Sequence, residues 1–244
     1  MAAGGGVSAW ARAMSISSSL GQTICSIIEQ SGLAGECMLC GAASEAALCP
    51  PCIADLPQQT PADETLAVAI PAAGEPSRAD CVAAPHVVAH ALWRYADPAD
   101  RVVLGFKYGG HAGVARLWAQ QVAAHLPRVD AVVPMPMHPL RLAERGENPA
   151  EVMARELCRK LPARPRLLRA IKTRPTARQQ GLDRAGRLAN VAGAYRFETG
   201  LDGQRVLLVD DVLTTGASLL ELAKAARAAG AASVAAAAMA RASH

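Results

Sequence analysis

One stretch near the C-terminal end of the sequence constrains the fold more than any other. Four apolar residues run directly into two adjacent acids and then into small and hydroxyl-bearing residues, in the order Val206-Leu-Leu-Val-Asp-Asp-Val-Leu-Thr-Thr-Gly-Ala-Ser218. The apolar run predicts a buried strand over residues 205–209, and the spacing of later apolar residues predicts a helix over 219–229, with Gly230 where a C-terminal cap belongs. A buried strand followed at once by a helix is typical of a sheet of parallel strands.

The residues between this strand and this helix suit a sugar phosphate. Asp210 and Asp211 would lie at the edge of the sheet, where adjacent carboxylates can bind sugar hydroxyls or a hydrated Mg²⁺ but not an anion. The stretch contains no Gly-Lys-Ser/Thr and is therefore not a Walker A loop. It predicts a site for a ribose 5-phosphate, with an ordinary strand–turn–helix as the alternative. The residues that can present N–H groups and hydroxyls to the phosphate at the helix start are Thr214, Thr215, Gly216, Ala217 and Ser218.

Alternating patterns elsewhere in the chain predict the rest of the sheet. Strands that alternate with helices of 10–15 residues imply an α/β fold, a doubly wound parallel sheet with helices on both faces. Ligands of such sheets bind at the carboxyl ends of the strands, where the acidic loop would lie. The expected strands are 86–95, 130–134, 167–170, 205–209 and 233–239, and the expected helices are 98–106, 112–125, 149–161 and 219–229.

Four cysteines in two Cys-x-x-Cys pairs predict a metal site near the N-terminus. Eight residues separate Cys37 and Cys40 from Cys49 and Cys52, and each pair can bend two thiolates onto one ion. Four sulfur ligands leave no open position, so we expect a structural zinc knuckle without catalytic chemistry. The alternative, a thioredoxin-like redox motif, would be single and would follow a strand. The other cysteines lack partners at ligand spacing and are expected to be buried thiols: Cys25, Cys81 and Cys158.

The order of these features predicts a small domain followed by a large one. We expect a partly disordered leader with a short helix over residues 1–35, the cysteine knuckle over 36–57, a linker rich in Pro and Ala over 58–85, and the α/β domain over 86–244. No window holds 18 uninterrupted, strongly apolar residues, so no membrane span is expected. The leader lacks a compact apolar block, and clustered cysteines suit a reducing compartment; both indicate a cytoplasmic protein.

The basic charge of the chain is concentrated in its middle. Residues 128–196 contain 15 Lys and Arg against 6 Asp and Glu, although the net charge of all 244 residues is only +4. This segment is a candidate surface for a polyphosphate or a nucleic acid, with a solvated basic face as the alternative. Aromatic residues make up 3% of the chain, too few to form a stacking platform, so a nucleic acid would be contacted through its phosphates.

The stretch 206–218 resembles the signature with which type I phosphoribosyltransferases bind 5-phosphoribosyl 1-diphosphate (PRPP). Further motifs occur in the order found in the ComF family, the phosphoribosyltransferase-like proteins associated with natural competence and with gluconate-utilisation loci. The resemblance extends from residue 37 to residue 239 and includes the cysteine knuckle. The motifs are Phe106-Lys-Tyr-Gly-Gly110, Val133-Pro-Met-Pro-Met-His138, Arg141-Leu-Ala-Glu-Arg-Gly-Glu-Asn148, Thr176-Ala-Arg-Gln179 and Arg187-Leu-Ala-Asn-Val-Ala-Gly193.

The resemblance implies a role for each part of the site. Asp210 and Asp211 would face the ribose hydroxyls, the loop 214–218 would hold the 5-phosphate, and Mg²⁺ would accompany the diphosphate. The two acids and Arg145 would be the catalytic residues. The cations that would meet the diphosphate are Lys107, Arg141 and Arg145.

The resemblance also implies a flexible loop over the site, spanning 173–187, with Thr176 and Gln179 at its tip. In one place the sequence departs from the family. Where the family usually reads Arg-Gly-Phe-Asn-Gln, this chain has Arg-Gly-Glu-Asn-Pro over residues 145–149, which introduces an acid into a basic loop. Arg141 and Arg145 have an alternative role as surface partners of Glu144 or Glu147.

Two functions are consistent with these residues. In the first, the protein is a phosphoribosyltransferase, in which an unidentified acceptor displaces diphosphate from the anomeric carbon of PRPP while Mg²⁺ and cationic side chains stabilise the leaving group. In the second, the protein is a non-catalytic factor of DNA uptake that binds PRPP and contacts single-stranded DNA or competence machinery through the basic segment and the knuckle. The intact acids and phosphate loop favour ligand binding over a structural role, but they do not decide whether turnover occurs.

Overall fold

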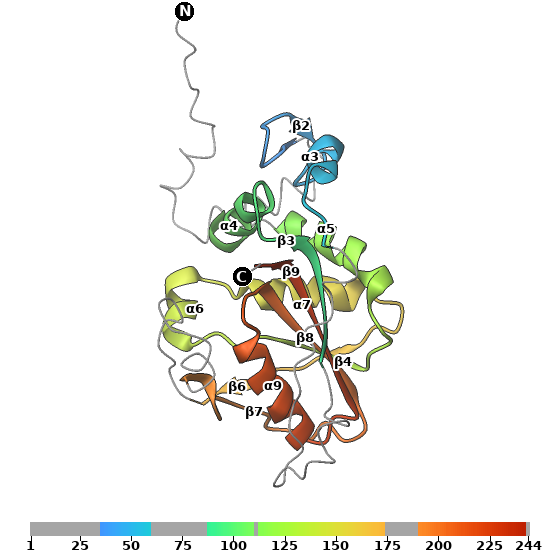
Figure 1. Ribbon diagram of the computed structural model, residues 1–244, viewed down its shortest axis with the longest axis vertical. Coiled ribbons are helices and arrows are strands. Elements are labelled where there is room, and N and C mark those ends of the chain that lie inside the picture. The colour runs from blue at the N-terminus through green and yellow to red at the C-terminus, as the bar shows by residue number, and fades with distance from the viewer. Residues whose placement is uncertain (1–34, 60–86, 110–111, 174–189, 243–244) are drawn as a thin grey trace, which may run out of the picture.

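A sheet of five parallel strands forms the centre of the protein in a computed structural model that describes residues 35–59, 87–109, 112–173 and 190–242 (Figure 1). Each neighbouring pair of strands runs parallel. The strands, in their order across the sheet, are β3 (Val88–Arg94), β9 (Ser233–Arg241), β8 (Arg205–Leu213), β4 (Ala131–Pro134) and β5 (Arg166–Leu167).

Helices cover both faces of this sheet (Figure 1). One face packs against α4 (Ala99–Gly109), α5 (Ala112–Val122) and α7 (Pro149–Lys160), and the other against α9 (Ala217–Ala228). Successive residues of a strand supply opposite faces, as strand geometry requires. Leu207 thus lies in the core beneath the three helices, and its neighbour Leu208 lies in the core beneath α9.

Smaller elements complete the described chain. A short antiparallel pair, β6 with β7, lies beside α9, and a two-stranded hairpin, β1 with β2, lies in the cysteine knuckle. These elements are β1 (Gly35–Glu36), β2 (Ala43–Ser44), α3 (Pro50–Ala54), the 3₁₀ turn η3 (Ala123–His125), α6 (Pro139–Arg145), β6 (Ile171–Lys172) and β7 (Tyr195–Arg196).

The strand order contains a switch point between β4 and β8. From β4 the chain passes through α7 to β5 on one side, and from β8 it passes through α9 to β9 on the other side. Two adjacent strands whose connections leave in opposite directions create a crevice at their carboxyl ends, where ligands of open α/β sheets bind. The acids of β8 lie at this crevice.

The predicted α/β fold class is confirmed, and most predicted elements are present within a few residues of their expected ends. The predicted end of the strand at 209 is wrong: β8 continues to Leu213 because its pairing with β9 extends to the Leu213–Arg241 register. The two acids are therefore residues of the strand itself. The patterns did not predict α6 or the β6–β7 pair, which are short or join distant segments.

The cysteine knuckle packs directly on the α/β domain. Buried Leu48 and Leu56 belong to the same hydrophobic cluster as Trp93 of β3 and Phe106 of α4. The backbone after the knuckle also pairs with the edge strand, since the Arg94 N–H donates to the Pro57 carbonyl at 2.8 Å. The two predicted domains thus share one apolar core.

Some predictions concern segments outside the described residues. These are the leader with its short helix, most of the linker, Cys25, Cys81, Thr176, Gln179 and most of the loop 173–187. Within the described residues, none of the helices has the length and apolar character needed to cross a membrane.

Candidate functional site

A cleft of about 270 Å³ opens at the switch point between β4 and β8. It is bounded by the last turn of α4, the loop after β4 together with α6, the β6–β7 pair, the end of β8 and the first turn of α9. The fold brings together residues that lie about a hundred positions apart in the sequence, such as Lys107 and Asp211. The charged residues that line this cleft are Lys107, Arg141, Arg145, Lys172, Asp210 and Asp211.

The two acids lie where β8 outruns its neighbour. The register of β4 with β8 ends at Pro134 and Val209, so beyond that point the described part of β8 pairs with β9 alone. The Asp211 N–H donates to Oδ1 of Asp210 at 2.8 Å. Burial and the neighbouring charge of Asp211 raise the pKa of Asp210 to about 7. A carboxyl with such a pKa is one that a cation or a hydroxyl donor would stabilise in its ionised form.

Lys107 provides such a cation. Its Nζ lies 3.0 Å from Oδ1 of Asp211, and the two side chains are 18% and 17% exposed. Because this pair is largely shielded from water, its attraction is stronger than that of a surface ion pair. Two carboxylates beside a sugar-sized space are also oxygen ligands of the kind that hydrated Mg²⁺ accepts, so the donor set fits that ion.

The loop between β8 and α9 presents the expected phosphate-binding groups at the start of a helix. Gly216 has φ +73° and precedes the first turn of α9, which has no side-chain cap, so its leading N–H groups are not satisfied by the helix itself. The Thr215 hydroxyl is buried and lacks a hydrogen-bond partner within the described residues. Ser218 lines the cleft, Thr214 is exposed, and Ala217 is buried. An orphaned buried hydroxyl beside the N–H groups at the start of a helix fits an anionic ligand.

The opposite wall is held by Asn148, whose role the sequence did not reveal. Its side chain is 9% exposed; Nδ2 donates to the Met135 carbonyl at 3.0 Å, and Oδ1 accepts from the Ala150 N–H at 3.1 Å. The first contact fixes the loop after β4, and the second caps α7. The sequence signal for this role was the position of Asn148 directly before Pro149, an arrangement that is common at the start of a helix.

The two arginines of α6 line the cleft and have no acidic partner among the residues that the structure describes. Neither Arg141 nor Arg145 makes an ion pair with a described residue, so the alternative pairing with Glu144 or Glu147 is not observed. The guanidinium of Arg145 instead lies 5.2 Å from the ring centroid of Tyr108. Glu147, the departure from the family pattern, pairs with Arg155 of α7 at 3.2 Å.

A third wall comes from the β6–β7 pair, which sequence patterns did not predict. Lys172 lies with Nζ 5.8 Å from the ring centroid of Tyr195, and both residues line the cleft. Burial raises the pKa of Tyr195, and a hydrogen bond between its hydroxyl and Ser218 partly offsets this rise. These two-residue strands carry no periodic signal, because they become neighbours only in the folded chain.

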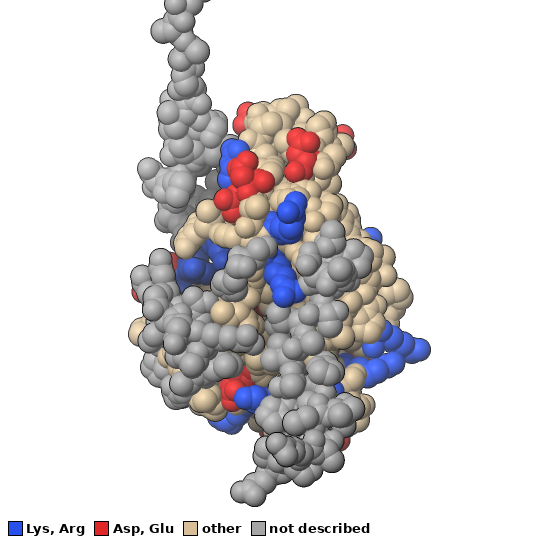
Figure 2. Space-filling model, in the orientation of Figure 1, with Lys and Arg blue, Asp and Glu red and all other residues tan. Residues whose placement is uncertain are grey.

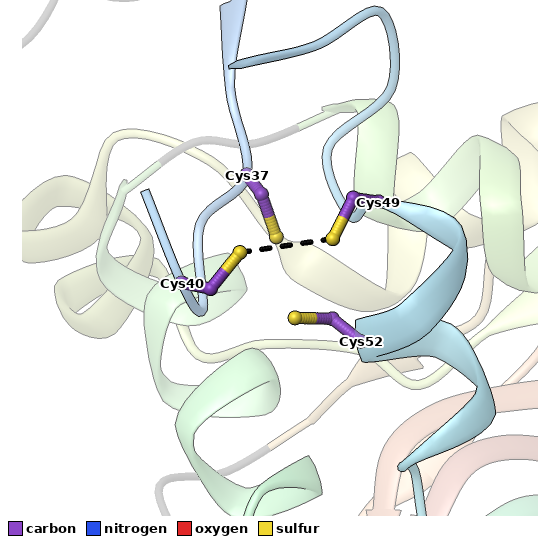
Figure 3. Close-up of side chains that lie close together, drawn as sticks. All are labelled: Cys37, Cys40, Cys49 and Cys52. Atoms are coloured by element: carbon purple, nitrogen blue, oxygen red, sulfur yellow. Dashed lines mark hydrogen bonds between the residues drawn. The ribbon is translucent and has the colours of Figure 1, made fainter. Parts of the chain in front are cut away.

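The four cysteines of the knuckle converge on one point (Figure 3). Cys37 and Cys40 lie on the turn of the β1–β2 hairpin, and Cys49 and Cys52 lie at the start of α3. Their Sγ atoms lie within 4.8 Å of one another, with 3.7 Å between Cys40 and Cys49. Gly41 has φ +75°, which lets the chain reverse directly after the first pair. The predicted ligand set is therefore assembled and can hold one metal ion.

The thiols of this cluster also differ from an ordinary cysteine. Burial opposes ionisation of Cys37, but backbone N–H groups of the cluster outweigh it and lower its pKa to about 6. The neighbouring Cys49 side chain and burial raise the pKa of Cys52 above its usual range. A cation bound among the four sulfurs would favour the thiolate form of each. By contrast, partial burial alone raises the pKa of Cys158 to about 11; this thiol is half-buried, whereas the sequence predicted a buried one.

Comparison with known proteins identifies the family of the large domain. Residues 102–244 match the phosphoribosyl transferase domain family. Over 149 residues the chain is 29% identical to competence protein F of Haemophilus influenzae, covering 56% of this chain and 65% of that protein. Over 95 residues it is 33% identical to DNA utilization protein YhgH of Escherichia coli, covering 39% of this chain and 42% of that protein. The chain thus spans less than two thirds of the length of these curated relatives.

Solved structures of phosphoribosyl-transferring enzymes show partial likeness. Glutamine phosphoribosylpyrophosphate amidotransferase of B. subtilis is 20% identical with a TM-score of 0.37, over 55% of this chain and 30% of that chain. Orotate phosphoribosyltransferase of Aeropyrum pernix is 24% identical with a TM-score of 0.30, over 55% of this chain and 59% of that chain.

Proposed function

The chain belongs to the phosphoribosyl transferase domain family, in its ComF branch, and from this premise we propose that the cleft binds PRPP together with Mg²⁺. One observation carries the proposal. Two adjacent carboxylates at the end of β8 share a cleft with two arginines that have no acidic partner among the described residues, and with the first turn of α9, which lacks a side-chain cap. The carboxylates suit the ribose hydroxyls of PRPP, the N–H groups at the start of α9 suit its 5-phosphate, and the arginines suit its diphosphate.

Each part of the cleft would take one part of the ligand. The N–H groups and hydroxyls of 214–218 would bind the 5-phosphate, and Asp210 and Asp211 would accept hydrogen bonds from the ribose hydroxyls. Arg141 and Arg145 would bind the diphosphate, for which planar guanidinium groups suit two oxygens at once. Mg²⁺ would neutralise the diphosphate and polarise its bond to the sugar.

The same parts would support transfer of the phosphoribosyl group. An acceptor lone pair would form a bond to the anomeric carbon as the bond to the diphosphate oxygen breaks, and the electron pair would leave with the diphosphate. The arginines would stabilise the charge that develops on the leaving group, and the aspartates would tolerate positive charge on the sugar. Catalysis thus extends the binding proposal and is tested by diphosphate release across a panel of bases, amines and oligonucleotides.

Binding itself is tested with pure protein and two carboxylate variants. Mg²⁺–PRPP should raise the melting temperature of the parent, and Asp211→Asn should weaken the affinity measured by calorimetry at least tenfold. Glu198→Gln is the matched control, since Glu198 is an exposed carboxylate outside the cleft lining. A parent protein with neither thermal shift nor heat of binding would refute the proposal.

We further propose that the ion of the knuckle is zinc, with one ion per chain and a structural role. Four sulfurs bound about 2.3 Å from a zinc ion lie about 3.8 Å apart in a tetrahedron. The distance of 3.7 Å between Cys40 and Cys49 supports this geometry. Elemental analysis of protein purified without added metal should give one zinc per chain, and a metal-free protein that is fully folded would contradict the proposal.

A role in DNA handling is the second candidate, favoured by the basic segment and by relatives named competence protein F and DNA utilization protein. The knuckle is a poor contact for DNA, since residues 36–57 contain three acids and neither Lys nor Arg. Figure 2 shows acidic side chains gathered toward the knuckle end, with Lys and Arg side chains over the α/β domain. Single-stranded DNA would therefore meet the α/β domain through its phosphates.

Salt dependence and competition separate this candidate from the first. Affinity for a single-stranded oligonucleotide should fall steeply as salt rises from about 50 to 200 mM, because released counterions drive such binding. If DNA uses the cleft, Mg²⁺–PRPP should displace it, and if DNA uses another basic surface, both ligands should bind together. Affinity that does not change with salt would exclude phosphate contacts.

A further inference from the structure

The knuckle and the cleft are connected through α4. Met38 lies between the metal-ligating Cys37 and Cys40, and its half-buried side chain reaches α4 at Gly105. A Cβ atom added to Gly105 would lie 2.5 Å from Cε of Met38. The Met38 side chain therefore fills the space over Gly105, and a larger residue at 105 would displace it.

This contact is part of a larger shared core. Cys37 and Leu48 of the knuckle are 1% and 0% exposed and belong to the same buried cluster as Val102 and Phe106 of α4. Because protein interiors are packed without spare volume, a displacement of the knuckle would be transmitted to α4. The turn that carries Met38 is held by the hairpin, where the Met38 N–H donates to the Ala47 carbonyl at 3.0 Å.

The last turn of α4 carries Lys107 into the cleft. Lys107 follows Phe106 directly, and its Nζ lies 3.0 Å from Oδ1 of Asp211. The residue that touches the knuckle and the residue that touches the acid are thus two positions apart on one helix. No residue of the knuckle lines the cleft itself in the described structure, so the knuckle can act on it only through α4.

We propose that Met38 and Gly105 are positioning residues for Lys107, so that the metal-bound knuckle sets the cation that faces Asp211. The knuckle then helps to set the geometry of the cleft and is not an independent module. The consequence for the ligand rests on the proposed function: a displaced knuckle weakens binding of PRPP through Lys107. The ion pair between Lys107 and Asp211 can be measured without any ligand.

The decisive experiment measures that ion pair in two backgrounds. Lys107→Met, Asp211→Asn and their double variant give the coupling between the two side chains from urea unfolding. In the parent, the coupling should be about threefold to tenfold in the unfolding equilibrium constant. In Gly105→Leu, which displaces Met38, the coupling should fall to less than about twofold, and Met38→Ala added to Gly105→Leu should restore it.

Controls keep this test independent of fold and of the proposed function. Leu104→Ala changes an exposed residue of the same helix and should leave the coupling unchanged. If Gly105→Leu does not fold, Met38→Ala alone removes the contact from the other side and should also reduce the coupling. Each variant must retain the metal content of the parent, which shows that the knuckle itself is intact.

Ligand affinity gives the second readout. Gly105→Leu should weaken Mg²⁺–PRPP about tenfold in the parent but should have no further effect in the Lys107→Met background, because both act through one group. A coupling that survives Gly105→Leu would overturn the inference, whatever the ligand data. If the parent does not bind PRPP but the coupling between Lys107 and Asp211 is lost in Gly105→Leu, only the proposed function is refuted.

Discussion

The knuckle and the cleft reach their geometry by opposite routes. All four sulfur ligands come from sixteen consecutive residues, 37–52, so a hairpin turn and one short helix suffice to assemble them. The cleft gathers Lys107, Arg145 and Asp211 from three regions that meet only when the sheet forms. The knuckle is a local site that a bound ion would stabilise, and the cleft is a non-local site stabilised by the fold.

This difference determines where each site is vulnerable. A local metal site is lost through any one of its ligands, because the remaining thiolates repel one another and the ion contributes much of the folding free energy. A single change in the wall of a non-local cleft removes one contact with the ligand, whereas the shape of the cleft depends on the elements that carry its walls. The following experiments test that contrast, from the largest expected effect to the smallest.

The largest effect should come from an exposed cysteine. Cys40 is exposed, so Cys40→Ser removes little packing, yet it should eliminate the ion and lower the free energy of unfolding by at least about 3 kcal/mol. Zinc content and urea unfolding give the two measurements. Cys158→Ser is the control, and this half-buried thiol should cost about 1 kcal/mol with the zinc content unchanged. Equal losses in the two variants would mean that the knuckle needs no metal.

The next effect concerns the acid at the end of β8. Since the pKa of Asp210 is about 7, binding of Mg²⁺–PRPP should weaken by about a factor of ten for each pH unit below 7, where this carboxyl is protonated. In Asp210→Asn this part of the pH dependence should disappear and leave only the titration of the ligand. Calorimetry between pH 5.5 and 8 measures both, and identical profiles would exclude a role for ionised Asp210.

The stability of the protein without ligand should depend on pH in the opposite sense. The native chain keeps a proton on Asp210 up to about pH 7, whereas the unfolded chain loses it near the ordinary value of 3.8. Between these values the native state binds more protons, so this group favours folding increasingly as the pH falls toward 4. The parent should gain stability relative to Asp210→Asn over that window.

The same contrast explains how much the sequence revealed. The ligands of the knuckle could be predicted because their spacing alone defines the site, and Asp210 and Asp211 could be predicted because strand, acids and helix are contiguous. Lys172 and Tyr195 could not be predicted, since no local pattern shows that two distant dipeptides will pair beside α9. The end of β8 was also missed, because its last residues are specified by the partner strand β9.

A moderate effect is expected at the wall of the cleft. Asn148→Ala removes both the cap of α7 and the tie to the Met135 carbonyl, and it should lower the free energy of unfolding by about 1–3 kcal/mol. Asn148→Asp keeps an oxygen for the cap but has no donor for the carbonyl, so it separates the two contributions. If the loop after β4 forms part of the ligand site, both variants should also weaken PRPP binding. Full affinity in both variants would show that Asn148 serves α7 alone.

The smallest effect should follow from the residue that most disturbs the family pattern. Glu147 is close in sequence to Arg145 but pairs with Arg155, and both partners are about two-fifths exposed. Arg155 also forms an ion pair with Glu151 at 2.9 Å, which the variant retains. Glu147→Gln should therefore change the free energy of unfolding by less than about 0.5 kcal/mol. The affinity of this variant for Mg²⁺–PRPP should stay within about twofold of the parent, because the Glu147 carboxylate pairs with Arg155 and not with Arg141 or Arg145. A tenfold gain in affinity would instead show that Glu147, which lines a small pocket with Lys107 and Arg145, repels the diphosphate from beside the cleft.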